Sequence, residues 1–456
     1  MKTRPTKLGK LSSWRTIATA KRLTALLVIS LTLKQTFTIA ITQKPKKEHL
    51  KEDPSYDDIF PSEKTDFGYI PIGSPGSKFF YWLAPSRSNP DTDPLVIWVQ
   101  GGPGASALYG MFYENGPFYI KNEGDTKTTK RVEAWNNKAN MLWLDHPLGA
   151  GFSVAMDPDR PKTKRDIQRQ FLEFIQKFIA LPKFKKFKGR ELYITGESFA
   201  GHFIPYLAQA IYYLNDPDLN IRGIAIGNGW INQYSTYTYW TRFPAMYPKA
   251  TGMTPEKLER VSKRADLCAF YTNRKNPMFI LGLKREYCYD KVGDSIRYDS
   301  EGRLLFTEYN IYSKTDGPEF YKAFLNLPEV HKVLGVDTQW HQGSLTIFND
   351  MYPHDWLRDS SPEIETFLND PEQKVLFYNG DYDWICNWVG DQDAIRRMNW
   401  VNQTEFNRIE LEDCEYGKCK KLGKKMFVTV HAAGHMVPHD QPKKSLDLIN
   451  YFLHGI

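Results

Sequence analysis

The sequence predicts an α/β fold with a mostly parallel central sheet flanked by helices. Short apolar runs, typical of strands buried on both faces, alternate with longer amphipathic segments along most of the chain. Strands that are joined through helices pair in parallel, with right-handed crossovers. The chain has 456 residues and is 41% hydrophobic, which is enough to bury a large core.

The first predicted strand is "LVIWV" at Leu95–Val99, a continuous apolar run. The further candidate strands, in chain order, are Met141–Asp145, Glu191–Thr195, Ile221–Asn228, Lys374–Gly380 and Met426–Val430. Between them, Asp166–Ala180 repeats apolar residues at spacings of three and four, which predicts an amphipathic helix. Phe203–Leu214 is a second predicted helix of this kind.

The alternation of strands and helices lapses over residues 234–315, a stretch rich in Lys, Arg, Tyr and Pro. We expect this stretch to be a lid insertion between two parts of one core domain, residues 65–233 and 316–456. Residues 41–64 are charged and contain proline, which favours a flexible N-terminal segment of the mature protein.

The first 40 residues have the pattern of a secretory signal peptide. A basic stretch to Arg22 precedes an apolar block, Leu23–Leu33, and small residues follow at Thr38 and Ala40. A mitochondrial transit peptide and a buried N-terminal helix are the alternatives, the first because the segment contains no acidic residue. The apolar block is too short for a bilayer, so we expect no stable membrane span.

The charge of the chain gives no reason to expect a nucleic-acid partner. Its net charge of +7 arises in the predicted signal peptide, which holds eight of the 60 lysines and arginines and no acid. The signal implies the secretory pathway, with a secreted or a vacuolar or lysosomal destination. The tripeptide that begins at Asn402 is a candidate N-glycosylation site for that route.

Five cysteines are compatible with an oxidising compartment. We predict two disulfides, Cys268–Cys288 and Cys414–Cys419, and a free, buried Cys386 in an apolar context. The alternative is that all the cysteines are reduced.

A candidate nucleophile lies at Ser198, in the pattern Gly196-x-Ser198-x-Ala200. The pattern follows a predicted strand and precedes a predicted helix, the context of a nucleophile elbow, and the tight corner needs small residues on both sides. The helix N-terminus behind the serine favours negative charge. The alternative is an ordinary helix-capping serine.

A nucleophilic serine needs a base and an orienting acid, which in this fold type follow in the order Ser, Asp, His. Candidates lie just beyond the carboxyl ends of two predicted strands, where α/β active sites form. Spacing alone does not choose among them: Asp381, Asp383, His431, His435 and His439.

An oxyanion hole needs two backbone N–H groups aimed at one point. One donor is expected from Phe199, which follows the serine, and the other from the glycine-rich loop Gln100–Ser106. A plain Gly-Pro turn is the alternative for this loop. A phosphate-binding loop is disfavoured because no Gly-Lys-Ser/Thr ending follows.

Together, "WVQGGPGASAL", "ENGPF", "NMLWLDHPLGAGFS", "ITGESFAGHFIP", "YNGDYDWICNW" and "AAGHMVPHDQP" give the chain a resemblance to the serine carboxypeptidases. The resemblance runs from about Tyr69 to the C-terminus and is weakest in the insertion. It implies an α/β-hydrolase fold and a secreted or vacuolar exopeptidase that acts on peptide and protein C-termini. It implies neither a cofactor nor a metal.

Residue by residue, the resemblance implies Ser198 as nucleophile, His435 as base and Asp383 as orienting acid, with Gly102 and Phe199 as oxyanion donors. It also implies a site for the substrate's terminal carboxylate and apolar subsites that favour hydrophobic side chains. Two neighbouring carboxyl groups in that site cannot easily both ionise, and a protonated carboxyl group can donate a hydrogen bond to the substrate's carboxylate. We therefore expect activity to be best at acidic pH. The carboxylate-binding residues would be Gln100, Glu114 and Glu197, and the subsite residues Tyr113, Cys386 and Met436.

The chain departs from the family's usual pattern at three positions. Gln100 replaces Asn, Ala105 replaces Cys, and His146 replaces Gln. The triad is untouched, so we expect an active peptidase. An acyltransferase of the same fold and a non-catalytic secreted protective partner are the alternatives, and a homodimer is an open alternative to a monomer.

Overall fold

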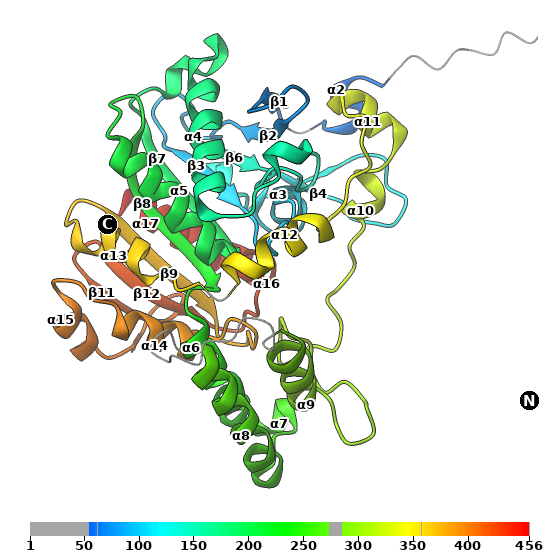
Figure 1. Cartoon of the computed structure of the whole chain (residues 1–456). Helices are drawn as coiled ribbons and strands as arrows, with labels where there is room; N and C mark the ends of the chain where they lie inside the picture. Colours follow the sequence, from blue (N-terminus) through cyan, green and yellow to red (C-terminus); the bar gives the residue numbers. More distant parts are fainter. Residues whose placement is uncertain (1–53, 62, 273–284, 357, 456) are drawn as a thin grey trace, which may run out of the picture. The chain divides into compact units, whose positions relative to one another are not determined.

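A mixed sheet of ten strands forms the centre of the computed structural model (Figure 1). The structure describes residues 54–61, 63–272, 285–356 and 358–455. The predicted signal peptide and residues 41–53 of the predicted flexible segment lie outside this range. The strand order is β1-β2-β6-β3-β7-β8-β9-β12-β11-β10.

The six central strands are parallel, and they are the six that the sequence predicts. The expected α/β fold is therefore confirmed. Strands β7 and β8 run further toward their carboxyl ends than the sequence predicts. The bounds are β3 Leu95–Val99, β6 Asn140–Leu144, β7 Glu191–Ser198, β8 Asn220–Gly229, β9 Lys374–Gly380 and β12 Lys425–Val430.

Antiparallel strands that were not predicted extend both edges of the sheet. On one edge β2 (Lys78–Ala84) pairs with β6, and β1 (Asp66–Pro71) pairs with β2. On the other edge β11 (Gly417–Leu422) pairs with β12, and β10 (Glu412–Asp413) pairs with β11. The disulfide Cys414–Cys419 closes this last hairpin, as predicted.

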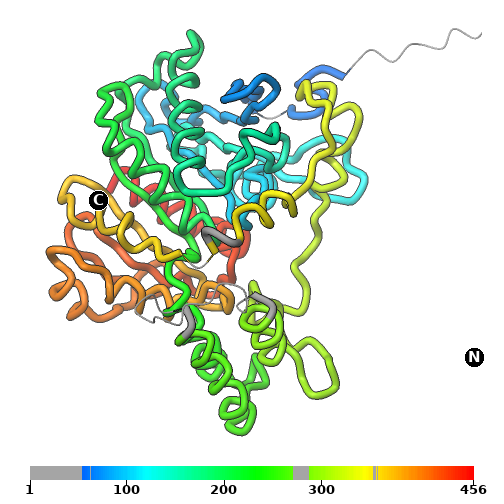
Figure 2. The backbone as a smooth tube through the Cα atoms, viewed as in Figure 1, coloured from blue at the N-terminus to red at the C-terminus, as the bar shows by residue number. Residues whose placement is uncertain are grey.

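The two faces of the sheet bury two separate cores, because successive side chains of a strand point to opposite faces. In β3, Ile97 lies in the core beneath α4 (Lys164–Ala180) and α5 (Ala200–Leu214). Its neighbour Trp98 lies in the other core, which includes side chains of α17 (Pro442–His454). Figures 1 and 2 show α4 and α5 in front of the strands and α17 behind them.

Shorter elements connect this framework. A small hairpin pairs β4 (Phe118–Tyr119) with β5 (Thr129–Lys130), and π-helices cover Gly110–Asn115 and Arg285–Val292. Turns of 3₁₀ helix cover Trp135–Asn137, Asp157–Asp159 and Pro182–Phe187. The remaining α-helices are α2 Tyr56–Ile59, α3 Ala107–Tyr109, α6 Gln233–Met246, α7 Pro248–Thr251, α8 Pro255–Thr272, α9 Gly293–Arg297, α10 Tyr321–Phe324, α11 Pro328–Leu334, α12 Leu345–Asp355, α13 Ser361–Asn369, α14 Trp388–Arg397, α15 Gln403–Arg408 and α16 Val437–Asp440.

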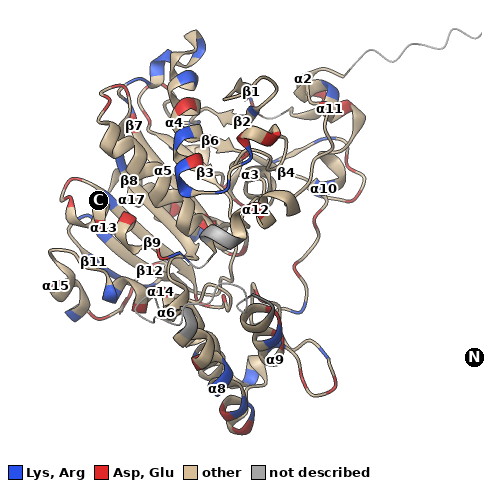
Figure 3. Cartoon of the chain, viewed as in Figure 1, with Lys and Arg blue, Asp and Glu red and all other residues tan. Residues whose placement is uncertain are grey.

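The described residues of the predicted insertion, 234–272 and 285–315, add no strand to the central sheet. Helices α6 to α9 lie here, and the predicted disulfide Cys268–Cys288 joins α8 to the second π-helix. Basic and acidic residues are interspersed along α8 (Figure 3). The role of this segment as a lid stays a prediction.

The predicted flexible segment comprises residues 41–64. Its described part, residues 54–61 and 63–64, contains the helix α2. Ile59 and Phe60 at the end of α2 are buried, and the Phe60 ring lies 5.2 Å from that of Trp82. This aromatic contact, which no local pattern reveals, anchors the start of the domain to β2.

Two surface features bear on compartment. Asn402, the candidate glycosylation site, is exposed at the start of α15. Over the residues that the structure describes, we find no helix with both the length and the apolarity needed to cross a membrane.

His146, which departs from the family's usual glutamine, follows β6 and is fully buried among aromatic rings. Its ring lies 6.0 Å from Phe79, 6.4 Å from Phe171 and 5.0 Å from Phe203. Neither ring nitrogen has a hydrogen-bond partner among the described residues. Burial lowers the pKa of His146 from 6.5 to about 3, so the native protein keeps this side chain neutral.

We expect His146→Gln to make the protein's stability less sensitive to acid. Below pH 6.5 the unfolded chain protonates His146 and the native state does not. The neutral side chain's contribution to the free energy of unfolding is therefore complete above pH 6.5 and shrinks as the pH falls toward 3. Between pH 7 and pH 4.5 the wild type should lose about 2–3 kcal/mol of unfolding free energy that the variant keeps. Urea denaturation at the two pH values measures this, with the exposed His454→Gln as control. Equal losses in wild type and His146→Gln would contradict the prediction.

Candidate active site

Ser198 lies at a strained corner between β7 and α5. Its φ is +63°, a left-handed conformation that a side chain other than glycine adopts only when the surroundings impose it. A Cβ added at Gly196 would collide with the carbonyl oxygen of Val99 and would lie 3.2 Å from the Cβ of Ala200. The small residues around the serine are therefore required by packing, as a nucleophile elbow demands.

The glycine-rich loop after β3 lies directly against this corner. A Cβ added at Gly101 would lie 2.6 Å from the backbone nitrogen of Phe199 and 2.7 Å from the Cβ of Ser198. Gly102 has a φ of +108°. Gly102, Ser198 and Phe199 all line one pocket, so the two candidate oxyanion donors and the serine share one space.

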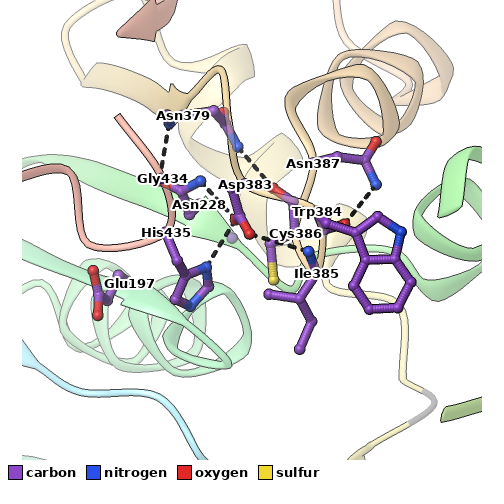
Figure 4. A network of polar contacts seen from close by, with 12 residues as sticks. Glu197, Asn228, Asn379, Asp383, Trp384, Ile385, Cys386, Asn387, Gly434 and His435 are labelled. Atoms are coloured by element: carbon purple, nitrogen blue, oxygen red, sulfur yellow. Dashed lines mark hydrogen bonds and ion pairs between the residues drawn. The ribbon is translucent and has the colours of Figure 1, made fainter. Parts of the chain in front are cut away.

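His435 and Asp383 form a buried hydrogen-bonded pair beside that pocket (Figure 4). Nδ1 of His435 lies 2.8 Å from Oδ2 of Asp383, and the two side chains are 4% and 0% exposed. Asp383 also accepts hydrogen bonds from Nδ2 of Asn228 at 2.7 Å and from the Ile385 backbone N–H at 3.0 Å. The carboxylate thus fixes the ring through Nδ1 and leaves Nε2 for a proton transfer within the pocket, which both His435 and Ser198 line.

Opposing effects act on the proton affinity of His435. Burial alone lowers its pKa, but the negative charge of Asp383 and the hydrogen bond to it raise the pKa above the ordinary value. The carboxylate therefore stabilises the protonated ring that a general base forms when it accepts a proton.

The other two candidate histidines lie elsewhere. Nδ1 of His431 lies 2.6 Å from Oδ2 of Asp381, but the His431 side chain is 68% exposed and the pair does not line the pocket of Ser198. The ring of His439 stacks on Tyr113 at 3.9 Å. Geometry thus separates three histidines that sequence spacing left equivalent.

Glu197, the residue before the serine, is buried and bound to Gln100. Nε2 of Gln100 donates to Oε1 of Glu197 at 2.7 Å. Oε1 of Gln100 accepts from the indole N–H of Trp98 at 2.7 Å, which orients the amide so that its NH₂ group faces Glu197. The longer side chain of Gln100 therefore keeps a donor within the site.

Glu114 lies on the π-helix Gly110–Asn115 and is the second buried carboxyl group of the site, 1% exposed. Burial raises the pKa of Glu114 to about 7, although interactions with Glu197 and His435 lower it. Burial and the charge of Glu114 raise the pKa of Glu197 well above its ordinary value. At acidic pH the Glu114–Glu197 pair therefore holds protons and can donate hydrogen bonds.

The predicted subsite residues divide between two pockets. Cys386 and Met436 line the pocket of Ser198. Tyr113 lines a neighbouring pocket together with Glu114. Its hydroxyl donates to the carbonyl oxygen of Asp316 at 2.6 Å, and Asp316 lines the serine pocket. The subsite role of Tyr113 stays a prediction.

Several residues around the serine pocket escaped the sequence analysis. Asn228, at the end of β8, supports Asp383, and the carbonyl of Tyr309 accepts the His435 backbone N–H at 2.7 Å. The polar end of β8 was a signal for the first, whereas nothing local marks the second. Further lining residues are Tyr109, Trp230, Tyr289, Trp356 and Ile385, with Asp316, Glu319 and Lys322 as charged members.

One group of side chains in the site has metal-ligand chemistry. Ligand atoms of Asp383, Cys386 and His435 lie within 4.8 Å of one another. Burial raises the pKa of the Cys386 thiol well above its ordinary value, so the thiol stays protonated and is a poor metal ligand. The hydrogen bond between His435 and Asp383 also occupies the atoms that would bind an ion. The arrangement favours proton transfer.

Comparison with known proteins gives consistent results. Residues 54–455 match the family model described as serine carboxypeptidase. Serine carboxypeptidase-like 48 from Arabidopsis thaliana is 32% identical over 417 residues, covering 85% of this chain and 78% of the relative. Carboxypeptidase Y homolog A from Neurospora crassa is 30% identical over 410 residues, covering 85% of this chain and 72% of the relative.

The fold has a counterpart among solved structures. KEX1(DELTA)P, a prohormone-processing carboxypeptidase from Saccharomyces cerevisiae, superposes with a TM-score of 0.74 at 24% identity, covering 88% of this chain and 93% of that one. At this identity the likeness supports the α/β-hydrolase fold alone. The family match spans nearly all of the described residues, and the chain belongs to the serine carboxypeptidase family of hydrolases.

Proposed function

We propose that this enzyme removes the C-terminal residue from peptides and proteins through an acyl intermediate on Ser198. The observation that carries the proposal is the buried pair of Glu114 and Glu197, of which Glu197 accepts a hydrogen bond from Gln100 and directly precedes the serine. Such a group suits a ligand that ends in a carboxylate, because protonated carboxyl groups and an amide all donate hydrogen bonds to it.

We propose a sequence of chemical steps that the positions of the side chains support. Nε2 of His435 accepts the Ser198 hydroxyl proton as the serine oxygen attacks the scissile carbonyl carbon. The backbone N–H groups of Gly102 and Phe199 stabilise the oxyanion. His435 then gives the proton to the departing amine, which leaves as the C-terminal amino acid. Water, activated by the same histidine, hydrolyses the acyl-serine and regenerates the enzyme.

The pH dependence of this mechanism combines two opposing requirements. Substrate binding needs protons on the Glu114–Glu197 pair, and the pKa of Glu114, about 7, sets the upper limit of that condition. Once the pair loses its protons, it repels the substrate's carboxylate, so KM rises with pH. Catalysis needs neutral His435, whose raised pKa favours higher pH. We therefore propose a peptidase that works best at acidic pH, with affinity lost before turnover as the pH climbs.

Hydrophobic side chains at the scissile bond are the proposed preference. Part of the pocket lining is apolar, which supports this choice: Trp230, Trp356, Ile385, Cys386 and Met436. Besides Glu197 and His435, the ionisable side chains Asp316, Glu319 and Lys322 line the pocket from the segment 316–322.

The alternatives are an acyltransferase and a non-catalytic protective partner. An acyltransferase has no need of buried carboxyl groups that recognise a terminal carboxylate, and a protective partner has no need of a hydrogen-bonded histidine beside a strained serine.

We propose that the enzyme acts in the secretory pathway, as a secreted or a vacuolar or lysosomal enzyme, on the strength of its leader sequence.

Ser198→Ala should abolish hydrolysis of N-blocked dipeptides and leave the fold intact. Loss of a triad nucleophile costs about a million-fold in turnover. A fluorophosphonate should label the wild type at Ser198 alone, which peptide mapping detects. Turnover that survives in the alanine variant, or stoichiometric labelling elsewhere, would end the hydrolase proposal.

His435→Ala should be nearly as damaging, whereas His431→Ala should remain close to wild type. The two variants are matched, because each removes an imidazole that is bonded to an aspartate, but only His435 lies in the pocket of Ser198. Turnover of one blocked dipeptide by both variants measures the difference. Similar losses in the two would show that the base is misassigned.

The affinity for a blocked dipeptide acid should fall as the pH rises toward neutrality, and the affinity for its C-terminal amide should not. Glu197→Gln provides a permanent hydrogen-bond donor, so it should flatten the rise of KM with pH for the acid. The measurement is KM against pH for both substrates in both proteins. Parallel curves for acid and amide in the wild type would mean that the carboxyl pair has only a structural role.

A further inference from the structure

The helix that carries Glu114 is held from behind by one arginine. Nη1 of Arg131 donates to the carbonyl oxygens of Met111 and Gly116 at 3.1 and 2.8 Å. Nη2 donates to the carbonyl oxygen of Phe112 at 2.7 Å. These carbonyls belong to the π-helix and to the residue that ends it. The Met111 carbonyl also accepts the Gly116 backbone N–H at 3.0 Å, whereas Pro117, five residues after Phe112, has no N–H to donate. The guanidinium thus adds three hydrogen bonds to carbonyl groups on both sides of Glu114.

Arg131 is itself fixed in place. Its backbone N–H donates to the carbonyl of Pro117 at 2.8 Å, and Nη1 of Arg87 donates to the Arg131 carbonyl at 2.8 Å. Arg87 is in turn paired with Glu63. The backbone of Arg131 is therefore held in place, and its side chain reaches the end of the helix from this fixed position.

Arg131 and Glu114 also line the same pocket, which differs from the pocket that Ser198 lines. The arginine is thus absent from the lining of the serine pocket.

We propose that Arg131 is a positioning residue for the terminal-carboxylate site, fixing the helix that carries Glu114 and holding a permanent positive charge near that carboxyl group. This inference rests on the proposed carboxypeptidase function.

The charge of Arg131 has a defined effect on the carboxyl pair. A positive charge stabilises the ionised form of Glu114 and lowers its pKa, against the larger effect of burial. His435 also lowers this pKa, but its own charge changes with pH, whereas that of Arg131 does not. Glu197 faces Glu114 within the pair. The other titratable groups that interact with Glu114 are Tyr109, Tyr113, Tyr321 and Tyr378.

The test is the pH dependence of KM for a blocked dipeptide acid and its amide in Arg131→Met, Arg131→Lys and wild type. Arg131→Met removes the charge, so the pH at which KM for the acid begins to rise should move upward by about one unit. Arg131→Lys keeps the charge but not the forked donors, so that pH should stay near the wild-type value. In both variants, KM for the acid should increase relative to KM for the amide at every pH, because the forked donors no longer hold the helix that carries Glu114.

Lys121→Met is the matched control. Lys121 is an exposed cation that lines the same pocket as Arg131, without a hydrogen bond to the π-helix among the described residues. This variant should keep the wild-type pH dependence for both substrates. A shift as large as that of Arg131→Met would assign the effect to the overall charge of the pocket and overturn the proposal.

The remaining outcomes separate the role of Arg131 from the proposed function. If Arg131→Met does not fold, Arg131→Lys carries the test, and an unchanged ratio of acid to amide KM in that variant would overturn the inference. Wild-type acid and amide curves that run parallel would instead refute the proposed recognition of the terminal carboxylate. Divergent wild-type curves that neither Arg131 variant changes would refute only the role of Arg131.

Discussion

Two carboxyl groups, those of Glu114 and Glu197, are buried together near the carboxyl end of β7 and constrain the whole site. Burying a carboxylate without a partner is costly, and burying two side by side is more so, since their charges repel. The chain meets this constraint by keeping protons on Glu114 and Glu197 at acidic pH and by giving Glu197 the amide of Gln100 as a donor. In the proposed function, a substrate that ends in a carboxylate would then meet donors where ionised groups would repel it.

The sheet explains how residues far apart in the sequence reach one place. The central strands are parallel, so their carboxyl ends meet at one edge, where α/β proteins form their sites. Each contribution comes at or just after the end of a strand: Gln100 after β3, Ser198 in β7, Asn228 in β8, Asp383 after β9 and His435 after β12. Glu114 is the exception, because it lies on a π-helix, and this difference gives Arg131 its importance as an external support.

The central strands, α4 and the two disulfides were predictable because each leaves a local signal, such as an apolar run, a helical spacing or a short cysteine separation. The β11 edge strand was not, because it reads "GKCKKL", and only pairing with β12 makes it a strand. The choice of His435 over His431 depended on the resemblance, since both follow the same strand and differ only in what they face. The pocket that Tyr113 lines was not predictable for a related reason, because the direction of a side chain on a π-helix cannot be derived from sequence spacing.

The central claim is that the carboxyl pair binds a terminal carboxylate only when it carries protons. Calorimetric titration of the inactive Ser198→Ala protein with a blocked dipeptide acid tests this directly, when it is repeated near pH 7 in two buffers of different ionisation enthalpy. The difference between the buffers gives the number of protons taken up on binding. The account predicts net uptake of protons with the acid and none with the amide. Binding of the acid without proton uptake, at a pH where the free pair is ionised, would contradict it.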